Sequence, residues 1–450
     1  MATYTLPARE LPLDDSWDVI VCGGGPAGCT AATAAAREGA KTLLVEATGC
    51  LGGMGTSGLV PAWCPFSDHE KVIYKGLAER VFNESRKTMH HVDAKQLDWV
   101  AIDAEQLKRV YDNMVSEAGV TVLFNTVLSA VESENGSVSH LIFSNKSGLS
   151  AYKAKVYIDC TGDADLATWA GAEFAQGDDS GDLQPATHCF TIANVDTYGY
   201  LFQRQRDNQY PIARIIDSGK YPEIIDRHFC NNLIGPNVVG FNAGHLWDVD
   251  NTDPFSVSRA LIQGRKIAAA FRDALAEFAP EAFANGHLVS TGALMGVRET
   301  RRIIGDYILT IEDYVTKRSF ADDIARNSYP IDVHHGKDKI EANRKGDFQC
   351  MNEFKRYGAG ESHGIPYRCL TPKSLTNVLV AGRSISCDRI VQGSVRVMPV
   401  CLAMGEAAGI AAYHALQQPE QNVHTIDVQQ LRTRLREYGA YLPEGDTVSA

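Results

Sequence analysis

The sequence predicts an α/β fold built on a parallel sheet, and two parts of the chain carry that prediction. Residues 18–46 contain an apolar strand, a glycine turn, an alanine-rich helix, a second apolar strand and a final Glu46. This order of elements is typical of one βαβ unit. Residues 152–160 and 377–381 are further apolar runs that lead into Gly162 and Gly382. They predict two more strands, the second returning from the far end of the chain.

The glycine turn of the βαβ unit has the spacing of a dinucleotide-binding loop. Gly23 would let the chain turn sharply out of the strand, and Gly25 would let the backbone approach phosphates. Gly28 would allow the helix to pack closely on the sheet. Glu46 would accept hydrogen bonds from a ribose 2′-hydroxyl and repel a 2′-phosphate. The alternative is a glycine turn that only packs a helix on a sheet.

The remaining elements follow in order along the chain. Residues 1–17 are expected to form an irregular arm, and residues 50–58 a loop too rich in glycine for regular structure. Helices are expected at residues 102–118, 256–278 and 400–416, the last headed by Pro399. Strands are expected at residues 120–124, 126–132, 138–143, 152–160 and 377–381. The charged stretch at residues 332–360 is a candidate lid.

The composition excludes several classes of function. The chain has 450 residues, 44% of them hydrophobic, which is enough for two or three domains with large cores. Its formal net charge is −12 and no basic block is present, so we expect neither nucleic-acid binding nor attachment to an anionic membrane. The eleven cysteines form no CxxC pair, and no His/Cys cluster has zinc-like spacing, so no metal site is expected. Without an apolar leader, we expect a cytoplasmic protein.

The late strand at residues 377–381 favours a flavin dinucleotide over a nicotinamide one. A nicotinamide domain is continuous and would not need this strand and Gly382. FAD is longer, and its ribityl chain and ring must be held by a segment that returns to the site.

Several longer motifs resemble the FAD-dependent oxidoreductase family of bacteria, within the glutathione-reductase-like flavoprotein superfamily. They are residues 240–245 (GFNAGH), 296–307 (GVRETRRIIGDY), 329–334 (YPIDVH), 364–373 (GIPYRCLTPK), 381–383 (AGR) and 393–399 (GSVRVMP). The resemblance covers nearly the whole chain after the arm. It implies a discontinuous Rossmann-like FAD-binding domain, residues 17–165 and 365–450, with an inserted α+β substrate domain, residues 166–364.

The resemblance also implies a set of FAD-binding residues. Residues 25–28 would face the pyrophosphate, Glu46 would hold the adenosine ribose, and Gly382 and Arg383 would lie near the ribityl and phosphate groups. The helix headed by Pro399 would aim its positive end at the N1 and C2 carbonyl region of the reduced flavin. The full predicted set is Gly23, Gly25, Pro26, Ala27, Gly28, Glu46, Gly52, Gly53, Met54, Val127, Gly162, Asp163, Gly382, Arg383, Val397, Met398 and Pro399.

The chemistry is expected to be direct hydride exchange between FAD and a small polar substrate, because no second strand–GxGxxG–helix unit is present. The predicted catalytic residues are His188, His245, His363 and Arg298. A histidine suits proton transfer near neutral pH, although each alone is more often structural. Arg298 could orient a substrate anion or a flavin carbonyl, or belong to a structural ion network. A separate electron acceptor, either oxygen or a redox partner, and a homodimer are also expected.

Two other functions stay open at this point. A flavin-dependent monooxygenase also lacks a second nucleotide-binding unit, and residues 159–163 (DCTGD) permit it. A protein that uses FAD only structurally, or in biosynthesis, is the third possibility.

Overall fold

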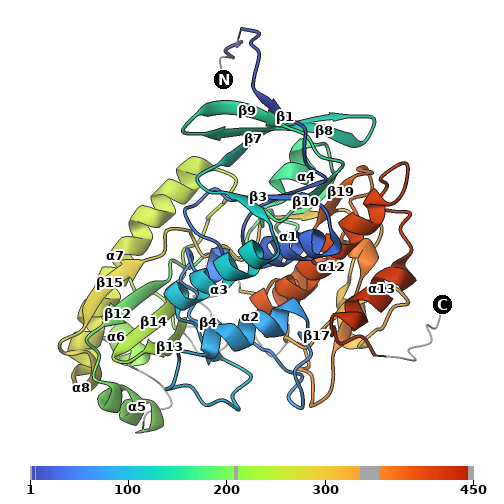
Figure 1. The fold of residues 1–450 in the computed structure, drawn as a ribbon. Coiled ribbons are helices and arrows are strands. Elements are labelled where there is room, and N and C mark those ends of the chain that lie inside the picture. Colours follow the sequence, from blue (N-terminus) through green and yellow to red (C-terminus); the bar gives the residue numbers. More distant parts are fainter. Residues whose placement is uncertain (1–2, 6, 207–210, 335–353, 444–450) are drawn as a thin grey trace.

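A parallel five-stranded sheet forms the centre of the molecule (Figure 1). The computed structural model describes residues 3–5, 7–206, 211–334 and 354–443. The strand order is β19 (Val378–Val380), β10 (Val156–Asp159), β2 (Val19–Cys22), β3 (Thr42–Val45) and β6 (Thr121–Leu123). All but β6 are fully buried, as expected for apolar strands covered on both faces. β19 pairs in parallel with β10, so both ends of the chain build one sheet, as predicted.

Two helices from opposite ends of the chain lie side by side against this sheet (Figure 1). They are α1 (Pro26–Glu38) and α12 (Met398–Leu416). A Cβ on Gly405 or Gly409 of α12 would come within 2.2 Å of a backbone oxygen of α1, so small residues permit this close contact. Thr30 of α1 also donates a hydrogen bond of 2.8 Å to the carbonyl of Leu402. The predicted packing role of the small-residue helix is therefore confirmed.

A second sheet lies between the N-terminal end of the chain and the central sheet (Figure 1). Its order is β1 (Leu13–Asp14), β9 (Gly148–Tyr152), β8 (Ser137–Asn145) and β7 (Val127–Glu134). Two expectations are corrected here. The N-terminal arm contributes β1, which pairs with β9. The apolar run at residues 152–160 is divided between β9 and β10, because the chain passes from one sheet to the other after Tyr152.

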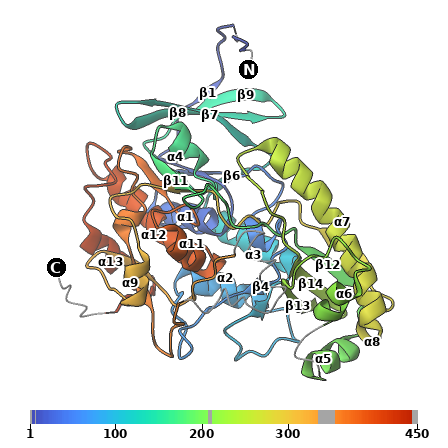
Figure 2. The ribbon, with the colours of Figure 1, turned by 180° about the vertical axis from the view of Figure 1, so that it is seen from behind.

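An antiparallel sheet from the middle of the chain is accompanied by helices, and we call this sheet and its helices the cap. The strand order is β13 (Phe229–Gly235), β14 (Val238–Ala243), β12 (Phe190–Ala193) and β15 (His287–Thr291). Its helices are α5 (Thr197–Arg206), α6 (Ile212–Ser218), α7 (Pro254–Phe278) and α8 (Pro280–Phe283). Phe190 stacks on Phe241 and Phe271, which gives this cap a hydrophobic core of its own. The long helix α7 runs along the outer edge of the cap (Figure 2).

The other elements surround the central sheet and join it to the cap. The helices are α2 (Leu77–Arg86), α3 (Ala104–Glu117), α4 (Asp165–Trp169), α9 (Ile311–Val315), α11 (Arg389–Val395) and α13 (Val428–Glu437), with short 3₁₀ turns η1 (Gly53–Gly55) and η2 (Tyr367–Cys369). The strand pairs are β4 (Ala62–Trp63) with β5 (Val100–Ala101), β11 (Phe174–Gln176) with β16 (Arg301–Ile303), and β17 (Asp323–Asn327) with β18 (His363–Pro366). Leu309, Tyr314 and Ile331 belong to the core around α1 and α12 rather than to the core of the cap.

Most of the predicted lid, residues 335–353, lies outside the described residues. Within the described ranges, no single helix is long and apolar enough to cross a bilayer. Helices α11 and α12 meet that test only when counted together, across a bend of 91°.

Candidate active site

The glycine loop has the backbone geometry that its residues predicted. Gly23 has φ +98°, and a Cβ there would lie 2.3 Å from the carbonyl oxygen of Cys160. A Cβ on Gly28 would lie 1.8 Å from the carbonyl oxygen of Gly23. Both positions therefore require glycine, the first for the turn and the second for close packing of α1 on the sheet.

Gly25 has a different environment, because among the described residues only its chain neighbours have atoms within 4 Å of where its Cβ would be. It precedes α1 without a side-chain cap, and the first turn of α1 holds no acidic residue. The free N–H groups and positive end of this helix therefore face an open space that suits a pyrophosphate. Gly53 lies next to Gly25, because a Cβ added to Gly53 would be 3.1 Å from the Cα of Gly25. The Gly52 N–H donates a 2.8 Å hydrogen bond to the carbonyl of Gly24.

Glu46 lies at the end of β3 with only 7% of its surface exposed. Its carboxylate accepts hydrogen bonds of 2.7 Å from the N–H groups of Gly24 and Thr48. Glu46 therefore also fastens the glycine loop, a role that the sequence did not indicate. The N–H of Thr126 donates to the carbonyl of Glu46, which places the predicted Val127 directly beside this end of β3.

The predicted residues from the two halves of the domain meet at Asp163. Arg383 donates to its carboxylate at 2.5 Å, as do Thr300 at 2.7 Å and Asn251 at 2.5 Å. Burial opposes ionisation of Asp163, but Arg383 and these hydrogen bonds outweigh it and lower its pKa. A Cβ on Gly382 would be 3.5 Å from Ala27 of the glycine loop. Gly382 and the first turn of α1 are therefore neighbours.

The N-terminus of α12 lies near the 3₁₀ turn η1. Val397 is its N-cap and provides no side-chain hydrogen bond, and Pro399 stands in its first turn. The sulfur of Met398 would be 3.2 Å from a Cβ on Gly55. A helix of 19 residues thus directs unpaired N–H groups toward the loop that also lines the pyrophosphate region.

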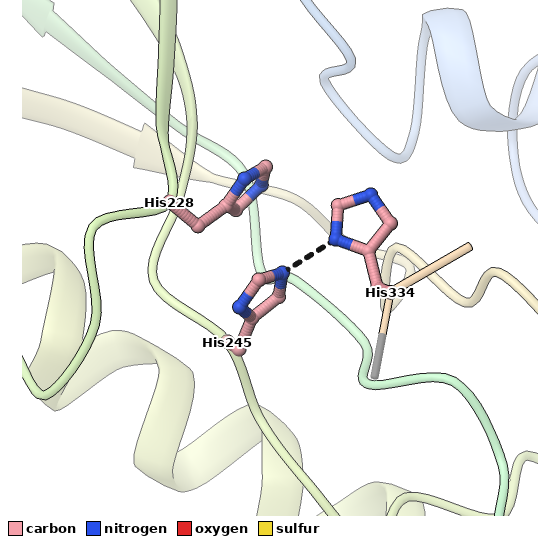
Figure 3. A group of neighbouring side chains, drawn as sticks. All are labelled: His228, His245 and His334. Atoms are coloured by element: carbon pink, nitrogen blue, oxygen red, sulfur yellow. Dashed lines mark hydrogen bonds between the residues drawn. The ribbon is translucent and has the colours of Figure 1, made fainter. Parts of the chain in front are cut away.

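Three imidazoles meet where the cap approaches this region, and we call His228, His245 and His334 the histidine cluster (Figure 3). Nε2 of His245 lies 2.8 Å from Nδ1 of His334 in a hydrogen bond. The ring of His228 stacks on that of His245, with centroids 4.3 Å apart and planes 11° from parallel. One ring nitrogen from each histidine lies within 4.8 Å of the other two.

Two aspartates face the outer nitrogens of the hydrogen-bonded pair. Nδ1 of His245 is 3.2 Å from Oδ1 of Asp226, and Nε2 of His334 is 3.2 Å from Oδ1 of Asp332. Asp226 also accepts from the backbone N–H groups of His228 and His245. Burial opposes ionisation of Asp332, but His334 and Arg396 hold its pKa well below the usual range. The cluster therefore faces one buried carboxylate, Asp226, and one partly buried carboxylate, Asp332.

Arg298 completes the site. Its guanidinium donates to the carbonyl of Pro185 at 2.7 Å and to Oγ1 of Thr187 at 2.9 Å, and another of its nitrogens lies 3.1 Å from Nε2 of His228. Within the described ranges, no carboxylate lies within 4 Å of it. Burial and the charge of Arg396 lower its pKa to about 10, so the group stays cationic at neutral pH. Arg298 is thus a buried charge with only neutral hydrogen-bond partners.

Hydrogen bonds connect this cluster to the segment that leads into α12. Arg396 donates to the carbonyl of Asp332 at 2.7 Å, and Gln392 of α11 donates to the carbonyl of Arg298 at 2.8 Å. Gln184 bonds both Gln392 and the backbone N–H of His334. The cluster is therefore positioned by the residues immediately before the helix that was predicted to face the flavin.

The other two predicted catalytic histidines have different neighbours. The ring of His188 lies against Gly264 of α7, and its Nε2 is 2.7 Å from the carbonyl oxygen of Gly292. His363 is fully buried in β18, with Nδ1 2.8 Å from the hydroxyl of Tyr357 and its ring beside Tyr314. Burial lowers the pKa of His363 to about 3. Of the four predicted catalytic residues, the structure brings together His245 and Arg298.

Sequence reasoning missed His228 and the two aspartates. A signal was present in the hairpin of β13 and β14, whose turn holds Asn237 at φ +60°. Counting the pairing outward from that turn places His228 opposite His245. A bulge between Leu233 and Gly235 shifts the partner by one residue to Gly244, whose N–H donates to the carbonyl of His228. The neighbouring Glu299 forms ion pairs with Arg302 and Arg389. Glu299 and Arg302 therefore belong to an ion network, the alternative that the sequence offered for this motif.

A comparison with known protein families assigns the chain to a family. Residues 18–435 match the family model described as FAD dependent oxidoreductase. The chain belongs to this family. It is therefore an enzyme, and its cofactor is FAD.

Two curated relatives match part of the chain. A tRNA uridine 5-carboxymethylaminomethyl modification enzyme of Zymomonas mobilis is 27% identical over 30% of this chain and 22% of its own length. A digeranylgeranylglycerophospholipid reductase of Thermoplasma acidophilum is 25% identical over 40% of this chain and 48% of its own length. The chain thus spans about a fifth and about half of these relatives.

A solved structure with a similar course is the geranylgeranyl bacteriochlorophyll reductase-like protein of Thermoplasma acidophilum. It has a TM-score of 0.46 and 13% identity, and the match covers 94% of this chain and 84% of that one.

Proposed function

We propose that this enzyme exchanges a hydride between FAD and a small polar substrate that carries an anionic group, at the histidine cluster and Arg298. The observation that carries the proposal is Arg298, a buried guanidinium with no carboxylate partner among the described residues. Asp332 raises the pKa of Arg298 through its charge, but no carboxylate of the described residues touches the guanidinium, and a planar carboxylate is the group that a guanidinium binds best. An anionic substrate would supply the missing partner.

FAD, when bound, supplies the hydride chemistry at its N5 atom. We propose that it lies between the glycine loop and η1, with its pyrophosphate at Gly25 and its ring near the N-terminus of α12. The support is the open space at Gly25, the two uncapped helix N-termini, and the meeting of Arg383 with Asp163. These residues come from both halves of the domain, as a cofactor of this length requires.

The residues of the chain have separate tasks in this proposal. Arg298 binds and orients the anionic group, because its carbonyl and hydroxyl partners hold the guanidinium in one place. His228 stands 3.1 Å from Arg298 and is the imidazole nearest to the bound group. The burial of Arg298 and His245, which are 6% and 9% exposed, keeps water away from the reacting carbon. A separate electron acceptor then completes the cycle.

The test is anaerobic mixing of the flavin-loaded enzyme with small hydroxy acids, amino acids and unsaturated acids while the flavin absorbance is followed. An active substrate should bleach the oxidised flavin band or restore it after chemical reduction. Arg298→Gln should lower kcat/KM for that substrate by about 100-fold or more, since the lost charge contact is buried. The matched control is Arg259→Gln, which removes an exposed arginine from α7 of the same cap.

Two results would contradict the proposal. An unchanged kcat/KM in Arg298→Gln would remove the anion contact from the mechanism. Oxidation of NAD(P)H coupled to substrate hydroxylation would identify a monooxygenase instead.

A further inference from the structure

The two hydrogen-bonded histidines and the two aspartates that face them form a continuous row of four side chains. In order, it runs from Asp226 to His245, then to His334 and finally to Asp332. Three contacts link these four groups, at 3.2, 2.8 and 3.2 Å. Each contact needs one proton between its two heavy atoms to be favourable, since carboxylates and unprotonated ring nitrogens are both acceptors.

Two neutral imidazoles bring only two N–H protons for these three contacts. One contact must then bring two lone pairs together. Neither aspartate contact has the geometry of a hydrogen bond, and Nδ1 of His245 is buried without a hydrogen-bond partner, so the missing proton belongs at one of the two aspartate contacts. This row of four side chains therefore has room for one more proton. That proton would turn the His245–His334 pair into a shared imidazolium between two carboxylates.

A metal ion could in principle take the place of that proton, but the ring geometry disfavours it. The lone pair of an imidazole nitrogen lies in the ring plane, and a bound metal lies about 2.0–2.1 Å from the nitrogen along it. His228 and His245 are stacked with planes 11° apart and centroids 4.3 Å apart. One ion cannot lie in both planes, so these two rings cannot bind it together in this arrangement.

The charges around the pair explain why it would hold the proton only at certain times. The charged and titratable groups facing it are Asp226, Asp332, Arg298, Arg396, His228, Cys189, Cys230 and Tyr329. With neutral histidines, the two aspartates balance the two arginines. Burial, and after it the charge of Arg298, lowers the pKa of all three histidines, and that of His334 falls to about 3.

An anion that pairs with Arg298 would neutralise the positive charge of the guanidinium and leave the site with one negative charge in excess. We infer that binding of an anionic substrate to Arg298 draws one proton from solvent into the His245–His334 pair. This inference rests on the proposed function and adds its regulation, because the site becomes an acid only when the substrate is present. The extra proton also restores the neutral balance of the buried cluster.

The test is calorimetric titration of the flavin-loaded enzyme with acetate and with oxalate, in two buffers of different ionisation enthalpy. We expect net proton uptake as the anion binds, with more protons taken up at pH 6 than at pH 8. The same linkage predicts that Kd rises about tenfold per pH unit over the range of uptake. His334→Gln and His245→Gln should each bind the anion and take up no proton. His287→Gln, which changes an exposed histidine of β15, should behave as the parent protein does.

The outcomes separate the two proposals. Anion binding that depends on Arg298 but takes up no proton would overturn this inference and leave the proposed function intact. The absence of anion binding would overturn both. One equivalent of a transition metal in the purified protein, lost in His334→Gln, would show that a cation rather than a proton fills the row of four side chains.

Discussion

Gly25 allows a sharp test of the cofactor site. A side chain added there would enter the space proposed for the pyrophosphate without meeting neighbouring protein side chains. We predict that Gly25→Ala weakens FAD binding without weakening the fold. Its φ of −71° suits any residue, and apart from its chain neighbours no residue that the structure describes has an atom within 4 Å of the new Cβ. The free energy of unfolding of the flavin-free protein should therefore change by less than about 1 kcal/mol.

The effect on FAD follows from the contacts at the start of α1. A methyl group at Gly25 would hold the pyrophosphate away from the N–H groups of the helix. Losing one hydrogen bond to a charged group costs about 1.5–3 kcal/mol, which corresponds to a Kd about 10- to 150-fold higher. The neighbouring Gly28→Ala is the contrasting variant, because its Cβ would meet the Gly23 carbonyl oxygen at 1.8 Å. It should lose about 1–3 kcal/mol of folding stability as well as FAD.

Three measurements on each variant would decide the matter. They are the ratio of flavin to protein absorbance after purification, the Kd for FAD added to flavin-free protein, and the urea denaturation of the flavin-free protein. Normal FAD affinity in Gly25→Ala would refute the placement of the pyrophosphate. Equal loss of stability in both variants would refute the argument from open space.

Three further predictions follow from single side chains. Glu46→Ala should lower both FAD affinity and the stability of flavin-free protein, the latter by about 1–3 kcal/mol, because one buried and one partly buried N–H group lose their acceptor; unchanged urea denaturation would contradict the loop-fastening role. His363→Phe should lower the melting temperature but leave kcat within about twofold, since its ring contacts tyrosines away from the histidine cluster; a large loss of kcat in a folded variant would restore it as a catalytic residue. Burial raises the pKa of Asp323 to about 7, so the folded protein holds one more proton than the unfolded chain between about pH 4 and 7, and stability should fall as pH rises through that window. Asp323→Asn should flatten this dependence in denaturation measured at pH 5 and pH 8, and an unchanged slope would show that another group carries it.

The cofactor half of the site could be predicted because its determinants are local. Gly23, Gly25 and Gly28 lie within one turn between a strand and a helix, and their spacing already implies the backbone shape that the structure shows. The return of the chain at Gly382 was predictable from the length of FAD and from the family motifs. The second role of Glu46 was not, because it depends on how the carboxylate folds back onto the loop.

The catalytic half depends on contacts between distant segments. His245 and His334 are 89 residues apart, and neither sequence run indicates that their rings meet. His228 reaches them through the register of one hairpin, and Asp332 through its bond to Arg396. His188 and His363 had equal claims in the sequence and lie among other neighbours.

The sequence by itself thus determined the fold class, the family and the cofactor, because a dinucleotide-binding unit is encoded in short-range spacing. Only the tertiary structure decided which histidines share a site with Arg298, and that Arg298 has no carboxylate partner among the described residues. The physical reason is that a buried charge and a shared proton are properties of a three-dimensional environment. They arise where the cap meets the segment before α12, and no single stretch of the chain contains them.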